Sequence, residues 1–361
     1  MRRILLAALA LLLLAMPVHA LEPDLTFGAE NLEQALDEQT REALSDASPT
    51  SAGDFGKELW HIVSSAISGA GLALRPALFS AGKVLAAAML CAFASGAQET
   101  DAMKLPAQLA GAFAITALCT RDVSSMIGLA REMITKLSDF TALLLPVLSS
   151  SLAASGGSVS AGTLLAGGSF AMSLLTKLAS GVLIPLVYVY ILLSAAECAT
   201  DGGGLGKIRA LGGRAISLLI KGLCAVFTAY LSLSRVLTGS ADAFALKAAQ
   251  AAFSGMVPVV GSMLSDASES LLASAGLIRS AAGAFGILAV ISMAIMPFLR
   301  LGAYYLALKL AGAIGDGAAM KPHAALLSNL ASAMGYMLAI AASALWMSLV
   351  SAACFLKAVN G

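Results

Sequence analysis

The segment from Asp201 to Arg214 combines glycine with basic residues, the residue types that cradle phosphate groups in nucleotide-binding loops. Its first nine residues are Asp201-Gly202-Gly203-Gly204-Leu205-Gly206-Lys207-Ile208-Arg209. A phosphate-binding loop ending in Gly-Lys requires glycine at the position of Asp201 and serine or threonine at the position of Ile208. Because both are missing, we interpret the segment as a flexible basic turn and expect it to bind no nucleotide.

Residues capable of nucleophilic or metal chemistry are otherwise scattered through the chain. Ser155-Gly156-Gly157-Ser158 is interpreted as a turn, since no general base is placed in the sequence to activate its hydroxyl groups. His61 and His323 lie far apart in the sequence, so we expect no metal site. Five cysteines occur singly, without a CxxC pair, and are interpreted as packing residues: Cys91, Cys119, Cys198, Cys224 and Cys354. We therefore expect no enzymatic activity and no cofactor.

Three lysines, Lys83, Lys221 and Lys309, interrupt long apolar runs. An ionised group at the centre of a bilayer costs about 2.5 to 3.5 kcal/mol on insertion scales, so such residues call for an explanation. Two interpretations stay open, namely snorkelling or packing against a neighbouring helix, and a contact or polar pathway inside the bundle. No acid lies in the same runs, which argues against an ordinary proton-coupled carrier.

The chemistry open to these residues depends on the solvent around the elements that carry them. Hydrophobic residues make up 59% of the 361 residues, charged residues 12%, and the mean hydropathy is +0.87. Such a chain cannot bury its apolar surface in a soluble core, so lipid must solvate it. We predict an all-α, polytopic integral membrane protein, a helical bundle in the lipid bilayer that binds no nucleic acid.

Six apolar stretches approach the length of a spanning helix, which needs about 20 residues to cross ~30 Å of hydrocarbon. They are Pro76 to Ala97, Leu105 to Cys119, Leu178 to Ala196, Ile216 to Ser234, Ala281 to Leu299 and Ala333 to Leu356. A further run, Leu301 to Ile314, is short and contains Lys309. We therefore predict about six to eight transmembrane helices.

The first 20 residues have the pattern of a cleavable signal peptide. Arg2 and Arg3 precede the apolar stretch Ile4 to Ala15, and Val18-His19-Ala20 supplies a small-residue cleavage site. Residues 21–60 then carry ten acids and two bases, which suits a translocated segment under the positive-inside rule. We predict an extracytoplasmic mature N-terminus followed by an acidic arm. A solvated, partly disordered lead-in is favoured over a docking arm for another protein.

Charge in the connecting segments predicts the topology. The segment 197–215 contains three bases, Lys207, Arg209 and Arg214, which marks it as cytoplasmic. Alternation of the predicted spans then leaves 121–177 and 235–279 outside the membrane or re-entering it.

A proline-valine element occurs twice, at Pro146-Val147 and at Pro258-Val259, each time before a long apolar run. The two copies are separated by 258 − 146 = 112 residues, and the same offset carries the run near Leu105 onto the one near Ser217. This spacing suggests two parallel repeat units, 105–196 and 216–300. Chance similarity between small and apolar residues is the other interpretation.

The segments that hold these prolines have the composition of surface helices. In residues 237–252 apolar residues recur every three to four positions with polar residues between them, the pattern of an amphipathic helix at a membrane surface. Pro146 and Pro258 are predicted to break the helices that contain them. The broken helices would form either a packing corner or the lining of a pathway. The residues predicted to form this interface or pathway are Pro146, Gly156, Gly157, Lys221, Asp242, Lys247, Pro258, Gly261 and Asp266.

These expectations divide the chain into seven parts. They are the signal peptide 1–20, the acidic arm 21–75, the first helix and turn 76–104, repeat unit 105–196, the basic loop 197–215, repeat unit 216–300, and the C-terminal helices 301–361.

Several runs resemble the stage III sporulation protein AE family. In the second half they are Ser240-Ala241-Asp242-Ala243-Phe244-Ala245-Leu246-Lys247-Ala248-Ala249, Val257-Pro258-Val259-Val260-Gly261-Ser262-Met263-Leu264-Ser265-Asp266-Ala267 and Gly283-Ala284-Phe285-Gly286. In the first half they are Leu145-Pro146-Val147-Leu148 and Ala154-Ser155-Gly156-Gly157. The similarity extends from about Leu105 to Leu356.

The resemblance implies a non-enzymatic subunit of a channel complex between the mother cell and the forespore, in the mother-cell membrane that surrounds the forespore. Its implied partners are other stage III sporulation A proteins, including a secretion-type ATPase and ring-forming subunits, and a channel partner made in the forespore. The family carries no catalytic residues to transfer to this chain. A multipass permease for a small solute remains the alternative.

Overall fold

The computed structural model describes residues 30–44, 55–96, 101–155, 157–199, 203–254, 261–318 and 321–357, with the side chains of 235–279 and a few helix-end positions left out. These residues form helices and turns without a strand. Two short helices, α2 (Glu30–Gln34) and α3 (Glu38–Ala43), precede the long ones. The long helices are α4 (Phe55–Gly96), α5 (Asp101–Ala154), α6 (Ser158–Leu178), α7 (Ile184–Ala199), α8 (Gly203–Ser254), α9 (Gly261–Gly317) and α10 (Lys321–Lys357).

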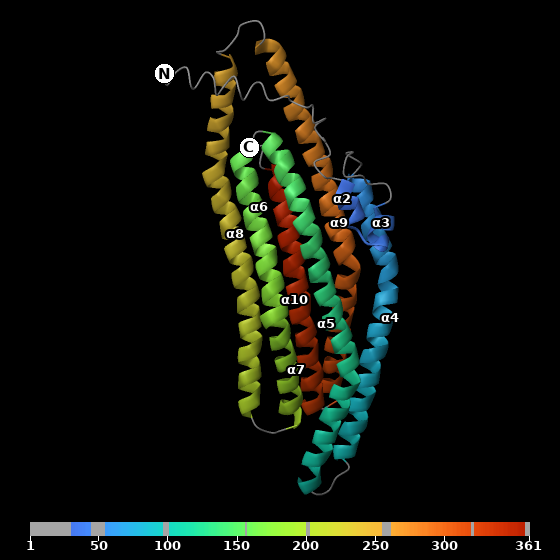
Figure 1. Cartoon of the computed structure of the whole chain (residues 1–361). Coiled ribbons are helices and arrows are strands. Elements are labelled where there is room, and N and C mark those ends of the chain that lie inside the picture. The colour runs from blue at the N-terminus through green and yellow to red at the C-terminus, as the bar shows by residue number, and fades with distance from the viewer. Residues whose placement is uncertain are drawn as a thin grey trace.

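The long helices form an up-and-down bundle (Figure 1). A five-residue π-helical turn, Ala179–Leu183, joins α6 to α7, so the two cross the bundle as one continuous rod. Six candidate spans are found among the described residues: Phe55–Phe93, Leu109–Ala154, Ser158–Cys198, Gly204–Ser234, Ser280–Gly317 and Pro322–Leu356. The prediction of an all-α membrane bundle is therefore confirmed.

Each of the six apolar stretches predicted from the sequence falls on one of these spans. The spans are longer than predicted, from 31 to 46 residues against the ~20 that a bilayer requires. The run Leu301 to Ile314 is the continuation of α9 rather than a separate element.

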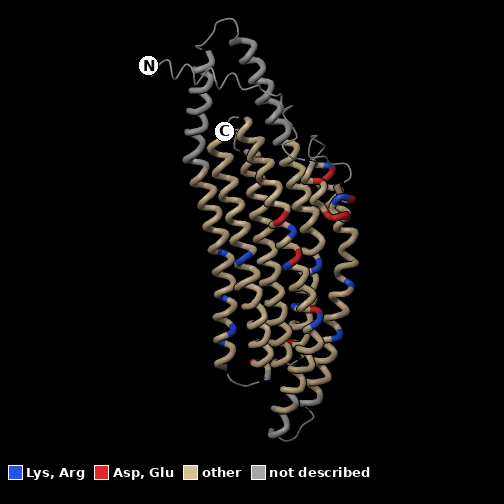
Figure 2. The backbone as a smooth tube through the Cα atoms, viewed as in Figure 1, with Lys and Arg blue, Asp and Glu red and all other residues tan. Residues whose placement is uncertain are grey.

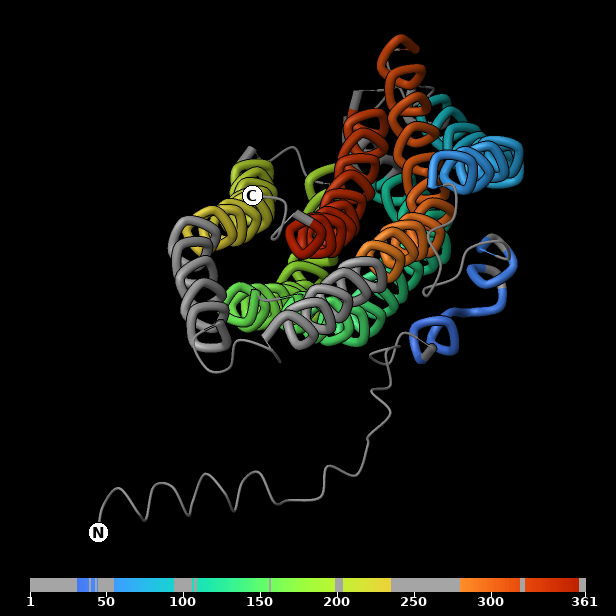
Figure 3. Tube along the Cα trace, turned by 90° about the horizontal axis from the view of Figure 1, so that it is seen from above, coloured from blue at the N-terminus to red at the C-terminus, as the bar shows by residue number. Residues whose placement is uncertain are grey.

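Helix α10 lies at the centre of the bundle, with α9 on one side and α6, α7 and α8 on the other (Figure 3). Its inward face is built from small and flexible residues that are fully buried, including Ala331, Ala341, Ala344 and Met337. A Cβ added at Gly312 of α9 would lie 3.1 Å from the backbone nitrogen of Ser328 in α10. Small residues let these two helices approach closely, which is how membrane helices gain packing energy without a hydrophobic drive.

The predicted break at Pro146 is wrong. Helix α5 continues through both Pro106 and Pro146 to Ala154. Pro146 lies on the exposed side of the helix, while Val147 and Leu148 beside it are buried in the core. A long helix packed on its neighbours tolerates the loss of one hydrogen bond at an exposed proline. The described residues of 121–177 accordingly belong to the α5 and α6 hairpin.

The expected repeat corresponds to two helical hairpins of the bundle. Hairpins α5–α6 and α8–α9 run in the same direction (Figure 1). Pro146 lies within α5, and Pro258 lies outside the described residues. Duplication of the hairpin itself stays a prediction.

Part of the acidic arm packs against the bundle, contrary to the solvated lead-in that we favoured. Leu32, Leu36 and Leu44 are buried and belong to the same core as the long helices. Helix α4 begins at Phe55, twenty residues before the predicted end of the arm at 75. The spacing of the three leucines lets the short helices point them at the bundle. The acids between them stay at the surface. The signal peptide lies outside the described residues.

Candidate functional site

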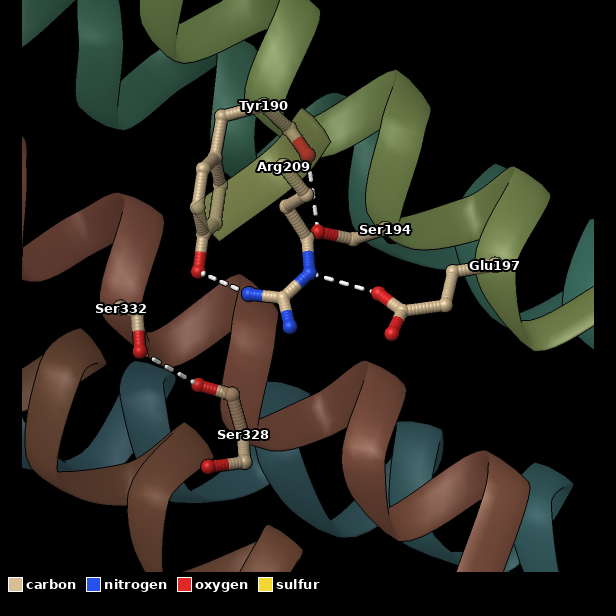
Figure 4. A network of polar contacts seen from close by, with 6 residues as sticks. All are labelled: Tyr190, Ser194, Glu197, Arg209, Ser328 and Ser332. Atoms are coloured by element: carbon tan, nitrogen blue, oxygen red, sulfur yellow. Dashed lines mark hydrogen bonds and ion pairs between the residues drawn. The ribbon is translucent and has the colours of Figure 1, made fainter. Parts of the chain in front are cut away.

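Charged residues gather on the arm helices α2 and α3, on α4, α5 and α9 and on the lower part of α8, and are sparse on α6, α7 and α10 (Figure 2). At the foot of the bundle, Glu197 near the end of α7 meets Arg209 in the first turns of α8. The Arg209 Nε lies 2.6 Å from Glu197 Oε2, and the side chains are 19% and 31% exposed. A second guanidinium nitrogen donates to the Tyr190 hydroxyl at 2.8 Å. Arg209 therefore joins α7 to α8 with two directed contacts (Figure 4).

A third helix completes this group, which we call the Arg209 cluster. Tyr336 of α10 packs edge-on against Tyr190 with ring centroids 5.3 Å apart. Gly213 of α8 faces this pair, and a Cβ there would collide with the Tyr336 hydroxyl. A Cβ at Gly206 would likewise collide with the Glu197 carboxylate. The two glycines leave room for the side chains of neighbouring helices.

A pocket of about 450 Å³ adjoins the Arg209 cluster. Its walls are Tyr190 of α7, Tyr336 of α10 and a face of α8 that carries Arg214 and Lys221. Both cations are exposed. Lys207, Arg214 and Lys221 are spaced seven residues apart, which places them on one face of α8. This spacing is the sequence signal that could have located the pocket.

A second polar group, which we call the arm cluster, joins the arm to the bundle. Lys136 Nζ of α5 lies 2.9 Å from Asp37 Oδ2 and 3.1 Å from Glu132 Oε1. Asp37 also caps α3 by accepting from the Thr40 backbone nitrogen at 3.0 Å. Burial by itself would raise the pKa of Asp37, but the hydrogen bonds from Thr40 and Lys136 outweigh it and lower the pKa from its ordinary value.

The arm cluster borders a pocket of about 490 Å³ between α3, α4, α5 and α9. Arg300 of α9 faces this pocket together with Glu132 and Lys136. Its charges are of both signs, so it has no net preference for a cation or an anion.

The three lysines that interrupt apolar runs have three different surroundings. Lys83 lies over the Phe79 ring, with Nζ 4.3 Å from the centroid. Lys309 donates to the Ser328 hydroxyl of α10 at 3.1 Å. Lys221 lines the pocket beside the Arg209 cluster. The first two have local partners on the bundle, and only Lys221 faces a cavity of the kind that the pathway interpretation requires.

Other polar contacts tie helices together within the apolar interior. The Ser80 hydroxyl of α4 donates to the Asp122 carboxylate of α5. The Thr141 hydroxyl of α5 donates to the Ser348 hydroxyl of α10 at 3.0 Å. Such side-chain bonds between membrane helices stabilise their association by about 0.6 kcal/mol each.

The structure does not assemble the predicted site residues into one place. Lys221 lines the pocket beside the Arg209 cluster, Pro146 is exposed on α5, and Gly157 is buried at the start of α6. Gly156 and Pro258 lie outside the described residues. Asp242 and Lys247 on α8, and Gly261 and Asp266 on α9, belong to helices whose side chains are outside the description there.

Tyr190, Glu197, Arg209 and Tyr336 were not predicted as site residues. Glu197 and Arg209 lie twelve residues apart within the predicted basic loop 197–215, a spacing that a tight helical hairpin brings together. Tyr336 lies more than a hundred residues away and has no local signal. Among the described residues, no group of three or more His, Cys, Asp or Glu could hold a metal ion. The expectation of no cofactor stays a prediction.

The fold and its polar clusters define a class, that of polytopic helical-bundle membrane proteins whose charged residues join neighbouring helices. The particular family follows from comparison with known proteins. The model of the family "Stage III sporulation protein AE" matches residues 46–358, and the chain belongs to that family. The resemblance read from the sequence is thereby confirmed, over a longer range than predicted.

A curated relative supports the same assignment. The chain is 28% identical over 191 residues to "Stage III sporulation protein AE" of Bacillus subtilis (strain 168). The alignment covers 52% of this chain and 47% of the relative, so it spans about half the length of that protein. No solved structure matches the chain.

Proposed function

We propose that this chain is a non-enzymatic membrane subunit of the channel complex that connects the mother cell to the forespore during endospore formation. The observation that carries the proposal is the match to the sporulation family over residues 46–358 of a chain that folds as a membrane bundle. Its role is to form a membrane platform needed for late development of the forespore.

The two ends of the bundle support an orientation for this platform. Helix α4 ends and α5 begins at the same end as α7 ends and α8 begins (Figure 1). Lys207, Arg209 and Arg214 lie at that end, which is therefore cytoplasmic under the positive-inside rule. The arm and the mature N-terminus lie outside the cytoplasm, and the protein lies in the mother-cell membrane around the forespore.

Each end then faces a different set of partners. The basic end meets a secretion-type ATPase of the mother cell through the segment 202–214. At the other end lie residues 235–254 of α8 and 261–279 of α9 (Figure 1). This hairpin contains Asp242, Lys247 and Asp266 and contacts ring-forming stage III sporulation A proteins, which connect to the channel partner made in the forespore.

The chemistry of the polar clusters supports a structural role. The Arg209 cluster and the Ser80–Asp122 and Thr141–Ser348 contacts each link two or three helices. The hydroxyls of Ser80, Thr141 and Tyr190 hydrogen-bond to groups on neighbouring helices, and these contacts do not form the nucleophile–base–orienter arrangement of covalent catalysis. These contacts hold the platform together.

The proposal is tested by deleting the gene in the native host and scoring vegetative growth, engulfment and a late forespore reporter in the same cells. We expect normal growth and engulfment with a silent reporter. Expression of the intact gene from a mother-cell promoter should restore the reporter, and expression from a forespore promoter should not. Restoration from the forespore alone would contradict the proposed location.

The deletion also distinguishes a channel subunit from a small-solute permease. A permease for a small solute predicts normal sporulation and a growth defect that depends on the nutrient supplied. Purification of the tagged protein from sporulating cells gives an independent test, since a channel subunit should retain the ATPase and ring-forming proteins. Normal spores in the deletion strain would refute the channel assignment.

A further inference from the structure

Arg214 and Lys221 form a pair of cations without an acid to neutralise them. They lie two turns apart on one face of α8, with a rise of about 10 Å between their Cα atoms. Within α7, α10 and residues 203–234 of α8, the sequence contains one acid, Glu197, and it is bound to Arg209. In the described part of the chain, no ion pair or hydrogen bond joins the side chain of Arg214 or Lys221 to another residue. Two unpaired cations beside a cavity call for an anion from outside the protein.

The cavity beside these cations has the size and the wall of a ligand site. Its volume of about 450 Å³ falls within the ~300 to 1,000 Å³ typical of small-molecule sites. Tyr190 and Tyr336 form a rigid wall, because their rings pack edge-on and Tyr190 is held by Arg209. Gly213 lets Tyr336 pack directly on α8, since a Cβ there would collide with the Tyr336 hydroxyl.

The rim of the cavity faces lipid rather than water. Leu211 and Leu218 flank Arg214 on α8 and are 66% and 72% exposed. Leucines exposed to this extent in a membrane bundle contact acyl chains, because hydrocarbon is their preferred solvent. Tyrosines beside the cations are typical of the interface between hydrocarbon and head groups. A ligand that enters past these leucines therefore brings an apolar part with it.

The geometry points to a binding site for the phosphate of an anionic phospholipid between α7, α8 and α10. The Arg214 guanidinium binds the phosphate oxygens with two parallel hydrogen bonds, and Lys221 adds a second positive charge. The acyl chains extend along the leucine side of α8. Arg209 is held by Glu197 and positions the tyrosine wall. Basic pockets between membrane helices on the cytoplasmic side have this chemistry in general.

Lipid binding by the full-length protein tests the site. The protein is purified in a neutral detergent and titrated with phosphatidylglycerol or with phosphatidylcholine, and bound lipid is counted by native mass spectrometry. We expect phosphatidylglycerol to bind more tightly than phosphatidylcholine. The Arg214→Gln/Lys221→Gln variant should lose about tenfold or more of the affinity for phosphatidylglycerol, since it removes two charge-assisted contacts.

A matched control removes two cations elsewhere. Lys83→Gln/Lys177→Gln changes the net charge equally, and neither residue lines the pocket. This variant should keep the affinity of the wild-type protein. Equal losses in the two variants would overturn the proposal, because they would show attraction by overall charge. Equal binding of the two lipids by the wild-type protein would overturn it as well.

Two further measurements distinguish a lipid site from a site for free anions and from a folding defect. Inorganic phosphate added in large excess should not displace phosphatidylglycerol, and displacement would show a site for free anions instead. The variants Lys221→Gln and Arg214→Lys are less prone to misfold than the double variant, because each changes one exposed side chain. With each variant eluting as the wild-type species, Arg214→Lys should bind better than Arg214→Gln/Lys221→Gln. Equal binding by these two would refute a role for charge at Arg214.

Discussion

The Arg209 cluster and the arm cluster both contain an ion pair, yet they are built in different surroundings. Arg209 and Glu197 are 19% and 31% exposed, belong to one helical hairpin and share a tyrosine with α10. Lys136 and Asp37 are 43% and 38% exposed and join the arm to α5 across 99 residues. The first pair connects transmembrane helices, while the second fastens a peripheral segment. An ion pair therefore stabilises the packing of transmembrane helices in the Arg209 cluster and the docking of the arm in the arm cluster.

Exposure decides how strongly each pair should resist mutation. Removing one partner of a buried pair leaves a charge without compensation and costs about 3 to 5 kcal/mol. An exposed pair typically contributes ~0.2 to 1 kcal/mol, because water and salt screen it. The Arg209 cluster lies between these limits and closer to the first.

The largest expected effect is that of Arg209→Ala. The change leaves the Glu197 carboxylate and the Tyr190 hydroxyl without their partner, so we expect a loss of about 2 to 3 kcal/mol in the free energy of unfolding. Unfolding of the purified protein by denaturant in detergent micelles measures it. The double variant Glu197→Gln/Arg209→Gln should lose less than Arg209→Ala, and equal losses would show that pairing contributes little.

Gly213→Ala should have the next largest effect. Its Cβ would collide with the Tyr336 hydroxyl, and relief of such overlap costs about 1 to 3 kcal/mol. The matched control is Gly212→Ala, because a Cβ at Gly212 meets no atom within 4 Å. That change should stabilise α8 by about 0.5 to 1 kcal/mol through helix propensity. The same unfolding experiment compares them, and a Gly213→Ala protein as stable as Gly212→Ala would contradict the tight contact.

Lys136→Gln should have a smaller effect, confined to the arm. We expect the arm to loosen with a loss of at most about 1 kcal/mol in docking free energy, and added salt should weaken docking of the wild-type arm in the same direction. An environment-sensitive dye attached at Gln34→Cys reports the release. Arg131→Gln is the control, since Arg131 is one turn away on α5 and does not line the arm pocket. Equal release by the two variants would indicate a general charge effect.

Acidification should have the smallest effect of these changes near neutral pH, because docking of the arm should weaken only at low pH. The pKa of Asp37 in the folded protein is lowered from 3.8, so its contribution to docking is complete above that value. The contribution is lost as pH falls through the lowered pKa. The dye at position 34 should therefore show constant docking from neutral pH to about pH 5 and release below pH 3.8. Asp37→Asn should remove this pH dependence, and release at neutral pH in the wild-type protein would contradict the assignment.

The number of spans could be predicted from the sequence, whereas their lengths could not. Each apolar run ended in the prediction at a charge or a proline, as Leu105 to Cys119 did before Arg121. In the structure α5 continues past Arg121 and Pro146, because the Ser80 hydroxyl of α4 supplies a contact for Asp122 and the residues on either side of Pro146 pack in the core. Local composition thus located the spans but placed several of their ends too early.

The candidate site shows the same limit. Lys221 and the basic segment were visible as charge in an apolar context, and they do line a pocket. The wall formed by Tyr190 and Tyr336 was not visible, since the two residues come from α7 and α10 and meet only when the bundle forms. The arm illustrates the converse, because its many acids hid the three leucines that pack on the core.

The sequence by itself determined the lipid solvent, the all-α class, the six apolar spans and the family. These properties follow from composition, run length and local motifs, which do not depend on how the helices are arranged. The tertiary structure alone decided which charges are paired, where the arm docks and which cations remain beside a cavity. Those features depend on contacts between helices. Small residues permit these contacts, as Gly213 does for the Tyr336 side chain and Gly312 for the backbone of α10.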